Sequence, residues 1–332
     1  MSGGITQLVA IGAQDAHLVG NPEVSFFRSV YKRHTNFAHV VERQVIQGNP
    51  TAGSISTIRL ERKGDLVSYV YLTHDSNNFT SSNIKQVELL IGGQVIDTQT
   101  QEFIESVAPD YLGSTFTKSR EKPDTFFPLR FWFCENFQSA LPLVSLQYHD
   151  VEIRITWGNN VSGTYECFAD FIYLDTDERQ ALANSPQEHL IYQVQKANVP
   201  NERVLDLQFN HPVKFLAANK NLLLDTTKKM KLQINGVDVG EDKKYTPHFN
   251  TAPRFFHCPF LGTYAGQDDT FLIPFCLDTN KLQPTGTLNF SRLDSVRIMA
   301  EEPLRQEADM VYGVNYNILR IQNGMGGLLY AN

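Results

Sequence analysis

The stretch VELLIGGQV at residues 87–95 returns later in the chain as MKLQINGVD at residues 230–238, 143 positions further on. In both copies an apolar run is followed by Gly-Gly or Asn-Gly, the dipeptides that two-residue β-hairpin turns prefer. Five more pairs of segments recur in the same order, with offsets between 144 and 149. These pairs are 44–45 with 193–194, 58–61 with 205–208, 128 with 274, 151–155 with 295–299, and 171–174 with 316–319. Matches that keep one order and nearly one spacing indicate two homologous units of about 145 residues.

The repeated segments have the pattern of β-strands. Apolar and polar residues alternate over 58–62, 151–155 and 205–209, which places one face of each strand on a core. The connections between strands are long, which favours Greek-key jelly rolls over simple meanders. The sequence therefore predicts an all-β protein of two tandem eight-stranded antiparallel jelly-roll sandwiches, with a few short helices in loops.

Prolines and short helical patterns interrupt the strands. Pro128 and Pro274 lie near the starts of apolar runs, where a strand tolerates a missing N–H. Residues 102–107 have apolar side chains at one-turn spacing and predict a short helix on a loop. Residues 176–183 follow Asp175, a good N-cap, and predict a second helix at the junction of the two units.

These patterns divide the chain into three parts. We predict an N-terminal arm at 1–36, a first jelly roll at 37–180, and a second jelly roll with the C-terminal strand and tail at 181–332. The arm lies outside the repeat. Within it we expect an extended segment at 8–11 and a short amphipathic helix at 26–33.

Composition narrows the function. The formal net charge of the 332-residue chain is −7, whereas a protein that coats DNA needs a basic face, so we expect no direct contact with nucleic acid. The four cysteines form no C-x-x-C pair and are predicted to be reduced residues of the core. The first residues have no basic signal-peptide pattern, and no apolar run approaches the roughly 20 residues that cross a bilayer. We therefore expect a soluble protein made in the cytoplasm.

Catalytic patterns are missing from the sequence. It contains no P-loop, G-x-S-x-G or H-E-x-x-H, and we predict no enzyme, no metal and no cofactor. The tripeptide Gly92-Gly93-Gln94 copies the catalytic motif of peptide-release factors, but its place between apolar runs predicts a hairpin turn. The rival class is a carbohydrate-binding or glycan-cleaving jelly-roll protein, which would need exposed tryptophan platforms. Trp132 lies in an apolar run read as a strand and Trp157 ends another, so both are predicted to be core residues.

Several motifs, in order along the whole chain, resemble one known family. They are GAQD at 12–15, GNP at 20–22, YKRHTNF at 31–37, FWFC at 131–134, FNHPVK at 209–214, PTGTLNFSRLD at 284–294 and NYNILRI at 315–321. This set resembles the major capsid proteins of nucleocytoplasmic large DNA viruses, which include the iridovirus and chlorella-virus shells. The resemblance implies a double jelly roll that assembles as a homotrimer, the pseudo-hexagonal capsomer of an icosahedral capsid. The chain is short for that family, which implies shorter outward-facing loops and leaves a minor capsid paralogue open as an alternative.

The resemblance also implies partners and a location. The partners are neighbouring capsomers, minor capsid and penton proteins, and an internal viral membrane; the location is the virion, after synthesis in the host cytoplasm. We expect one inner-face contact site in the arm, where aromatic side chains are paired with basic ones. Its residues are Phe26, Phe27, Arg28, Tyr31, Lys32 and Arg33. Cations beside aromatic rings suit a lipid headgroup layer or an acidic groove on a protein. In the alternative, the aromatics plug the base of the first jelly roll and the charges are solvated.

Overall fold

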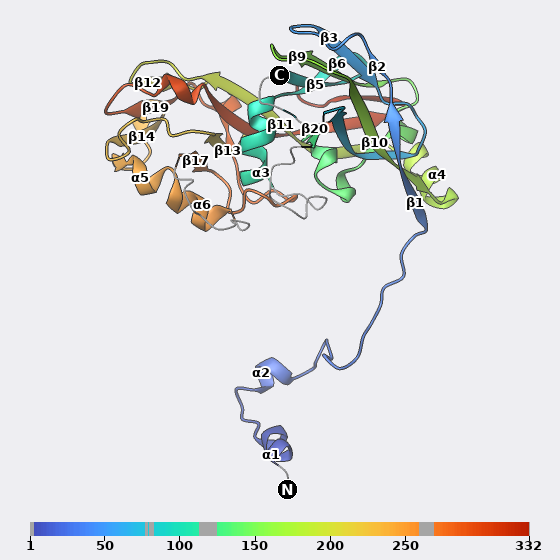
Figure 1. The fold of residues 1–332 in the computed structure, drawn as a ribbon. Helices are drawn as coiled ribbons and strands as arrows, with labels where there is room; N and C mark the ends of the chain where they lie inside the picture. The colour runs from blue at the N-terminus through green and yellow to red at the C-terminus, as the bar shows by residue number, and fades with distance from the viewer. Residues whose placement is uncertain (1–2, 77–78, 80–82, 113–124, 259–268, 332) are drawn as a thin grey trace. The chain divides into compact units, whose positions relative to one another are not determined.

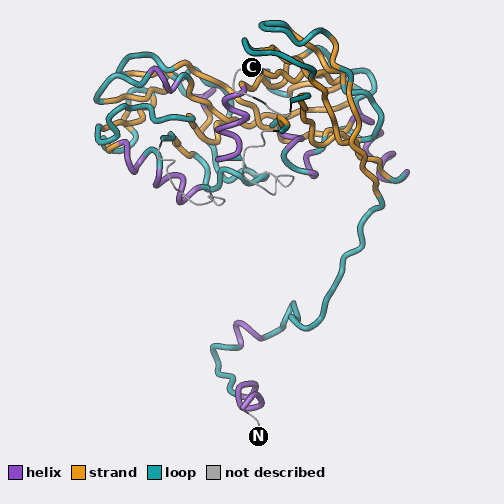
Figure 2. The backbone as a smooth tube through the Cα atoms, in the orientation of Figure 1, coloured by secondary structure: helices purple, strands orange, loops and turns teal. Residues whose placement is uncertain are grey.

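The computed structural model describes residues 3–76, 79, 83–112, 125–258 and 269–331. The chain separates into two units, Met1–Asn36 and Phe37–Asn332. The second unit holds all the strands found in the described residues, and strands dominate it (Figures 1 and 2). No helix in the described residues is long and apolar enough to span a membrane.

The first sandwich has two antiparallel sheets of five strands each. One sheet has the order β1 (Phe37–Gln44), β10 (Tyr165–Leu174), β4 (Leu66–His74), β7 (Phe126–Pro128), with β8 (Leu141–Pro142) also paired to β4. The other has the order β2 (Ile46–Gln47), β3 (Ile55–Arg59), β9 (Val151–Trp157), β5 (Ile84–Ile91), β6 (Gln94–Thr100).

The second sandwich repeats this plan. One sheet has the order β11 (Gln187–Asn198), β20 (Met310–Gln322), β13 (Pro212–Ala218), β17 (Phe271–Pro274), with β18 (Leu288–Asn289) on β13 and β21 (Met325–Leu328) on β20. The other has the order β12 (Val204–Asp206), β19 (Val296–Ala300), β14 (Lys229–Ile234), β15 (Val237–Asp238), with β16 (Lys243–Lys244) on β14.

Both sandwiches are jelly rolls. Leaving aside β2 and β8 in the first sandwich and β16, β18 and β21 in the second, each has eight strands, and the sheet orders are first-eighth-third-sixth and second-seventh-fourth-fifth in both. Such long crossings between two facing sheets define the jelly roll. The predicted fold class, two tandem eight-stranded jelly rolls with a few short helices, is confirmed.

Strand register supports the internal repeat. In the first sandwich Ile153 lies opposite both Ile58 and Leu89. In the second, Ile298 lies opposite both Leu205 and Leu232, the residues that the sequence matches to Ile58 and Leu89. Pairing partners therefore recur with the repeat.

The match of Gln44 with Gln193 is out of register. Phe168 lies opposite Tyr71 as Val314 lies opposite Phe215, so the counterpart of Cys167, which lies opposite Gln44, is Gly313. Gly313 lies opposite Gln195, so the match is wrong by two positions. The error arose because a shared Gln-Val dipeptide carried the match, while the two strands differ in length, eight residues in β1 and twelve in β11.

The two prolines end their strands instead of opening them. Pro128 is the last residue of β7 and pairs with Tyr71, and Pro274 is the last residue of β17 and pairs with Phe215. Each strand ends the path of its sheet, so the missing N–H interrupts no ladder.

Helices are short. The helix predicted after Asp175 is confirmed as α4 (Thr176–Asn184), where the Asp175 carboxylate accepts from the Thr176 N–H. The segment at 102–107 forms the π-helical turn η1 (Phe103–Val107), which continues as α3 (Ala108–Tyr111); its apolar side chains are buried instead of lying on an outer loop. Two further helices are α5 (Tyr245–His248) and α6 (Thr251–His257). The 3₁₀ turns are η2 (Trp132–Cys134), η3 (Phe137–Ser139), η4 (Leu143–Ser145), η5 (Phe290–Arg292) and η6 (Gln306–Ala308).

The arm differs from the prediction. Helices occur at α1 (Gly3–Val9) and α2 (Ala16–Val19), so Leu8 and Val9 are helical instead of extended. The predicted helix at 26–33 is wrong, because residues 26–27 form a turn and 29–33 have no regular structure. Phe27, Val30 and Tyr31 are weak helix formers, and a segment this short cannot offset the cost of helix nucleation.

Candidate functional site

The Gly92-Gly93 segment is the turn of the β5–β6 hairpin. Its φ angles are +58° and +80°, and those of Asn235-Gly236 between β14 and β15 are +49° and +78°. Positive φ at both central residues is the type I′ geometry that tight hairpins use. The prediction of a hairpin turn at the release-factor-like tripeptide is confirmed.

The predicted core residues are buried. Trp132 and Trp157 are 3% and 0% exposed, although Trp132 lies in the 3₁₀ turn η2 and not in a strand. Its flanking Phe131 and Phe133 favoured a strand in the sequence, but one short helical turn buries all three rings as well. Neither tryptophan offers a platform for a sugar ring. The four cysteines are free and buried, and burial raises the pKa of the Cys167 thiol to about 12.

Within the described residues, no group of three His, Cys, Asp or Glu side chains could hold a metal ion.

The main structural feature of the unit Phe37–Asn332 is the contact between its two sandwiches. We call this contact the seam; it is formed by residues 95–112 of the first sandwich against β11, β13 and β20 of the second. In Figure 1, α3 lies between the two sandwiches.

Apolar side chains make the seam part of one continuous core. Tyr111 at the end of α3 packs on Phe215 of β13, with ring centroids 5.8 Å apart, and Phe103 packs on Tyr312 of β20 at 5.4 Å. All four rings are at most 2% exposed. Burying an aromatic side chain contributes about 2–3 kcal/mol, so the two sandwiches should not separate without unfolding.

Buried hydrogen bonds fix the register of the seam. The Asp97 carboxylate on β6 accepts from the Val194 N–H of β11 at 2.9 Å, and the Gln193 amide donates to the Ile96 carbonyl. Desolvation raises the pKa of Asp97 to about 7, against hydrogen bonds from Val194, Gln99 and Thr98 that lower it. A carboxylate that accepts from the other sandwich specifies one alignment of the two strands.

A second polar group lies at Tyr312. Its hydroxyl contacts Thr100 Oγ1 at 2.7 Å and donates to Glu102 Oε2 at 2.8 Å, so it bridges β20 to the end of β6. Burial raises the pKa of Glu102. Both partners lie in the segment that leads from β6 into η1.

A buried ion pair lies beside the seam. Arg130 and Glu135 are 3.2 Å apart with both side chains almost fully buried, and the Tyr192 hydroxyl of β11 donates to the Arg130 carbonyl at 2.7 Å. A buried pair adds little net stability, but losing one member leaves an uncompensated charge. The pair therefore defines geometry more than it adds to stability.

The C-terminal strand crosses back to the first sandwich. The Tyr148 N–H donates to the Gly324 carbonyl at 2.9 Å, and His149 Nδ1 lies 2.8 Å from the Gly326 carbonyl oxygen. A Cβ on Gly326 would lie 2.6 Å from the end of the Leu146 side chain, so a larger residue there would force that buried side chain to shift.

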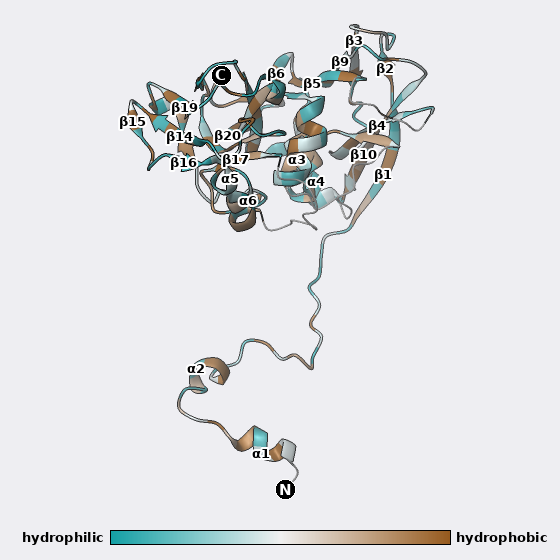
Figure 3. Ribbon diagram, turned by 60° about the vertical axis from the view of Figure 1, so that its left-hand side comes forward, coloured by the Kyte–Doolittle hydropathy of each residue, from teal (hydrophilic) through white to brown (hydrophobic). Residues whose placement is uncertain are grey.

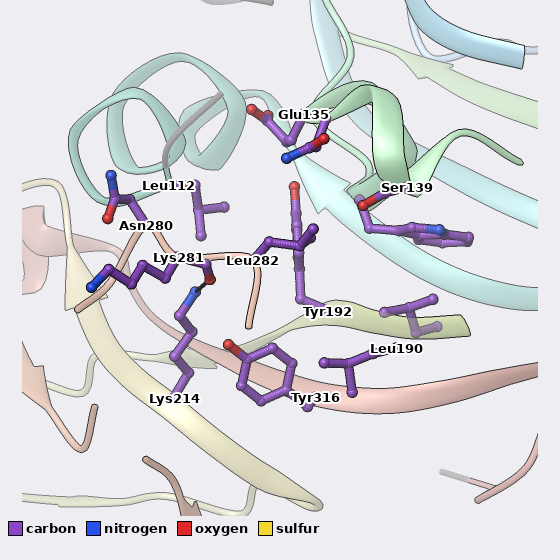
Figure 4. Close-up of a pocket in the computed structure, with 13 residues that line it drawn as sticks. Leu112, Glu135, Ser139, Leu190, Tyr192, Lys214, Asn280, Lys281, Leu282 and Tyr316 are labelled. Atoms are coloured by element: carbon purple, nitrogen blue, oxygen red, sulfur yellow. Dashed lines mark hydrogen bonds between the residues drawn. The ribbon is translucent and has the colours of Figure 1, made fainter. Parts of the chain in front are cut away.

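A hollow of about 170 Å³ opens beside the seam (Figure 4). Lys214, 3% exposed, directs its ammonium toward the Lys281 carbonyl at 3.5 Å and lies over the Tyr316 ring at 5.5 Å. Desolvation lowers the pKa of Lys214 to about 8. The Tyr316 hydroxyl also lines this hollow and is buried without a hydrogen-bond partner among the described residues.

Sequence reasoning missed these buried polar groups. Lys214 and Arg130 each stand inside an apolar run, Val213 to Leu216 and Leu129 to Phe133, and a charge in such a run is the one signal that could have pointed to them. Asp97 gave no signal, because β6 (QVIDTQT) has no apolar–polar alternation that would assign its side chain to one face.

The predicted contact residues all lie in the arm. The side chains of Phe26, Phe27 and Tyr31 are 90%, 100% and 83% exposed. Arg28, Lys32 and Arg33 are exposed as well. The six residues are neighbours in the sequence and lie in a stretch without helix or strand, and their role as a contact stays a prediction.

The fold and the seam together define a class of protein: a double jelly roll in which buried contacts and hydrogen bonds hold the two sandwiches in one register. Comparisons with known proteins identify the family. The protein family described as "Major capsid protein N-terminus" matches residues 25–108 and 110–175. The family described as "Large eukaryotic DNA virus major capsid protein" matches residues 217–327. The first match includes the basic aromatic segment of the arm.

Relatives match over the full chain. The major capsid protein of Pyramimonas orientalis virus is 33% identical over 398 aligned positions, and that of Paramecium bursaria Chlorella virus 1 is 29% identical; both alignments cover all of each chain. Among solved structures, the PBCV-1 virus capsid chain aligns with a TM-score of 0.75 and 26% identity, covering 93% of this chain and 100% of that one. The major capsid protein P2 of bacteriophage PM2, at 12% identity and a TM-score of 0.53, shares the fold.

This chain belongs to the family of major capsid proteins of large eukaryotic DNA viruses. It is a structural protein of the virion, and it is not an enzyme. The alignment of 398 positions exceeds the 332 residues of the chain, so the Pyramimonas virus relative carries insertions that this chain lacks.

Proposed function

We propose that three copies of this chain form a pseudo-hexagonal capsomer that tiles an icosahedral shell. One observation carries the proposal: two sandwiches of the same topology are locked side by side by a buried seam. A block with two like lobes gives a six-lobed outline when three copies close in a ring, and cyclic closure is the usual arrangement of homo-oligomers.

We further propose the finer partition and partners. The division between the jelly rolls falls at 180/181, within α4, with the arm at 1–36. The arm residues from Phe26 to Arg33 contact minor capsid or penton proteins, or the internal membrane, on the inner side of the shell. Synthesis takes place in the host cytoplasm, and the chain makes no direct contact with nucleic acid.

Two alternatives are separable. A minor capsid paralogue would have the same fold but a low copy number, which counting this chain in purified virions measures. The carbohydrate-binding alternative loses its support because both tryptophans are buried.

Electron microscopy of the purified protein tests the proposal. We expect class averages with threefold symmetry and six lobes of similar size. Averages that show isolated two-lobed particles at micromolar concentration would overturn it.

A further inference from the structure

The internal repeat places α5 and α6 where the first sandwich has η1 and α3. Lys244 of β16 lies opposite Lys229 of β14, as Thr100 at the end of β6 lies opposite Gln86 of β5. β16 is therefore the counterpart of the end of β6, at an offset of 144, and a helical segment begins directly after each of them.

The same offset carries the end of α3 to two exposed phenylalanines. Tyr111 and Leu112 are 2% and 6% exposed in the seam, whereas Phe255 and Phe256 are 73% and 76% exposed on α6. The two phenylalanine rings contact each other edge to face, 5.1 Å apart. In Figure 3 part of α6 is coloured brown, as hydrophobic, although the helix as a whole (TAPRFFH) is mixed in polarity. The second sandwich thus exposes large apolar side chains at the positions whose counterparts in the first sandwich are buried.

The surface that receives Tyr111 also has a counterpart. Tyr111 packs on Phe215, which belongs to the same sheet and the same buried cluster as Leu272 and Val314, and all three are 0% exposed. Phe215 pairs with Pro274, and Tyr71 of the first sandwich pairs with the matched Pro128, so Tyr71 is the counterpart of Phe215.

The other two members of this face follow from the same pairing. Val314 lies opposite Phe215 as Phe168 lies opposite Tyr71. Leu272 lies opposite Ala217 as Phe126 lies opposite Thr73.

These counterparts form an aromatic face on the first sandwich. Phe168 stacks on Tyr71 with centroids 5.6 Å apart, and Phe126 meets Tyr71 edge-on at the same distance. None of the three is fully buried, and Phe126 is 37% exposed. We call Tyr71, Phe126 and Phe168 the aromatic face.

We infer that Phe255 and Phe256 of one copy dock on the aromatic face of a second copy, repeating between chains the contact that α3 makes within the chain. This inference rests on the proposed ring of three copies. Each chain offers one helix end, on its second sandwich, and one receiving face, on its first, so the contact is head-to-tail and closes only in a ring. The occupant is a second copy because the seam already shows how these matched surfaces fit.

Site-specific crosslinking tests the contact. We would place a photo-crosslinking residue at the face, Tyr71→p-benzoylphenylalanine, and irradiate the assembled protein. The expected product is a covalent dimer in which the crosslink joins position 71 to a peptide that contains residues 251–257. Crosslinks confined to residues 1–36, or a ring of three copies without crosslinks to α6, would overturn the inference and leave the proposed capsomer intact.

Substitutions on α6 give an independent readout. The double variant Phe255→Ser with Phe256→Ser should remain folded, since both side chains are exposed, and should raise the protein concentration at which the oligomer dissociates by at least ~100-fold. The matched control is Leu224→Ser, which removes a side chain that is 78% exposed outside α6 and should change dissociation less than about 3-fold. Equal effects of the two variants would refute the docking. A wild-type protein that is monomeric throughout would instead refute the proposed capsomer.

Discussion

The two sandwiches share a strand order but not a surface. In the first, β6 is a continuous seven-residue strand that packs on β11 and leads into a buried helix. In the second, the equivalent strand is broken into β15 and β16, and Val237 and Val239 beside the break are 69% and 50% exposed. The difference lies in what covers each surface. The second sandwich covers β6 and the helix that follows it, whereas Val237, Val239 and the two phenylalanines of α6 stay exposed in the chain. Equivalent positions in the two sandwiches therefore contribute differently to the stability of the fold.

The largest expected effect concerns the helix ends. Tyr111→Ala should lower the free energy of unfolding by about 3–5 kcal/mol, because it opens a cavity in the seam. Phe255→Ala, at the matched position, should cost less than about 0.5 kcal/mol. Urea unfolding at a dilution where the chains are dissociated measures both. Equal losses would mean that the two helix ends are not differently buried.

The pH dependence of stability should come partly from the seam. Burial raises the pKa of Asp97 to about 7, above its unfolded value, so the stabilisation is complete below the unfolded pKa and is lost as pH rises through 7. Relative to Asp97→Asn, the wild-type protein should lose about 2–4 kcal/mol between pH 5 and 8. Unfolding free energies of both proteins across this range provide the test. Parallel profiles would show that Asp97 does not titrate there.

The two hairpin turns should tolerate substitution differently. A Cβ on Gly92 would lie 2.4 Å from the His149 ring, whereas the matched Asn235 already carries a side chain at a similar positive φ. Gly92→Asn should therefore cost about 1–3 kcal/mol despite suitable backbone geometry. Asn235→Gly should cost about 1 kcal/mol, since it loses only the hydrogen bonds to the Asp294 and Ser295 N–H groups. Thermal unfolding of both variants would contradict the comparison if Asn235→Gly were the more damaging.

The arm should have the smallest effect on folding. Removing residues 1–25 and neutralising Arg28, Lys32 and Arg33 should change the unfolding free energy by less than about 0.5 kcal/mol, because these side chains are exposed. Shell closure in an assembly reaction should nevertheless fail. If the variant forms normal shells, the proposed contact of the arm is refuted. If it does not fold, the arm belongs to the core.

The sequence predicted what the two halves share and little of what distinguishes them. The two hairpins and the equivalence of Ile153 with Ile298 were predictable, because a sequence repeat shows the features that both copies share. The seam was not, since Asp97 and Tyr312 act through partners on the other sandwich that strand periodicity cannot identify. Trp132 was assigned to a strand, because an apolar run this short fits a strand or a helical turn equally well. Residues 26–33 were assigned to a helix, but a segment this short does not offset the cost of helix nucleation.

The central claim is that a duplicated sandwich makes this chain one third of a closed ring. The most direct measurement is the mass of the purified protein in solution at micromolar concentration, by light scattering after size exclusion. The account predicts three times the chain mass of 37.6 kDa. A stable species of 37.6 kDa under the same conditions would contradict it.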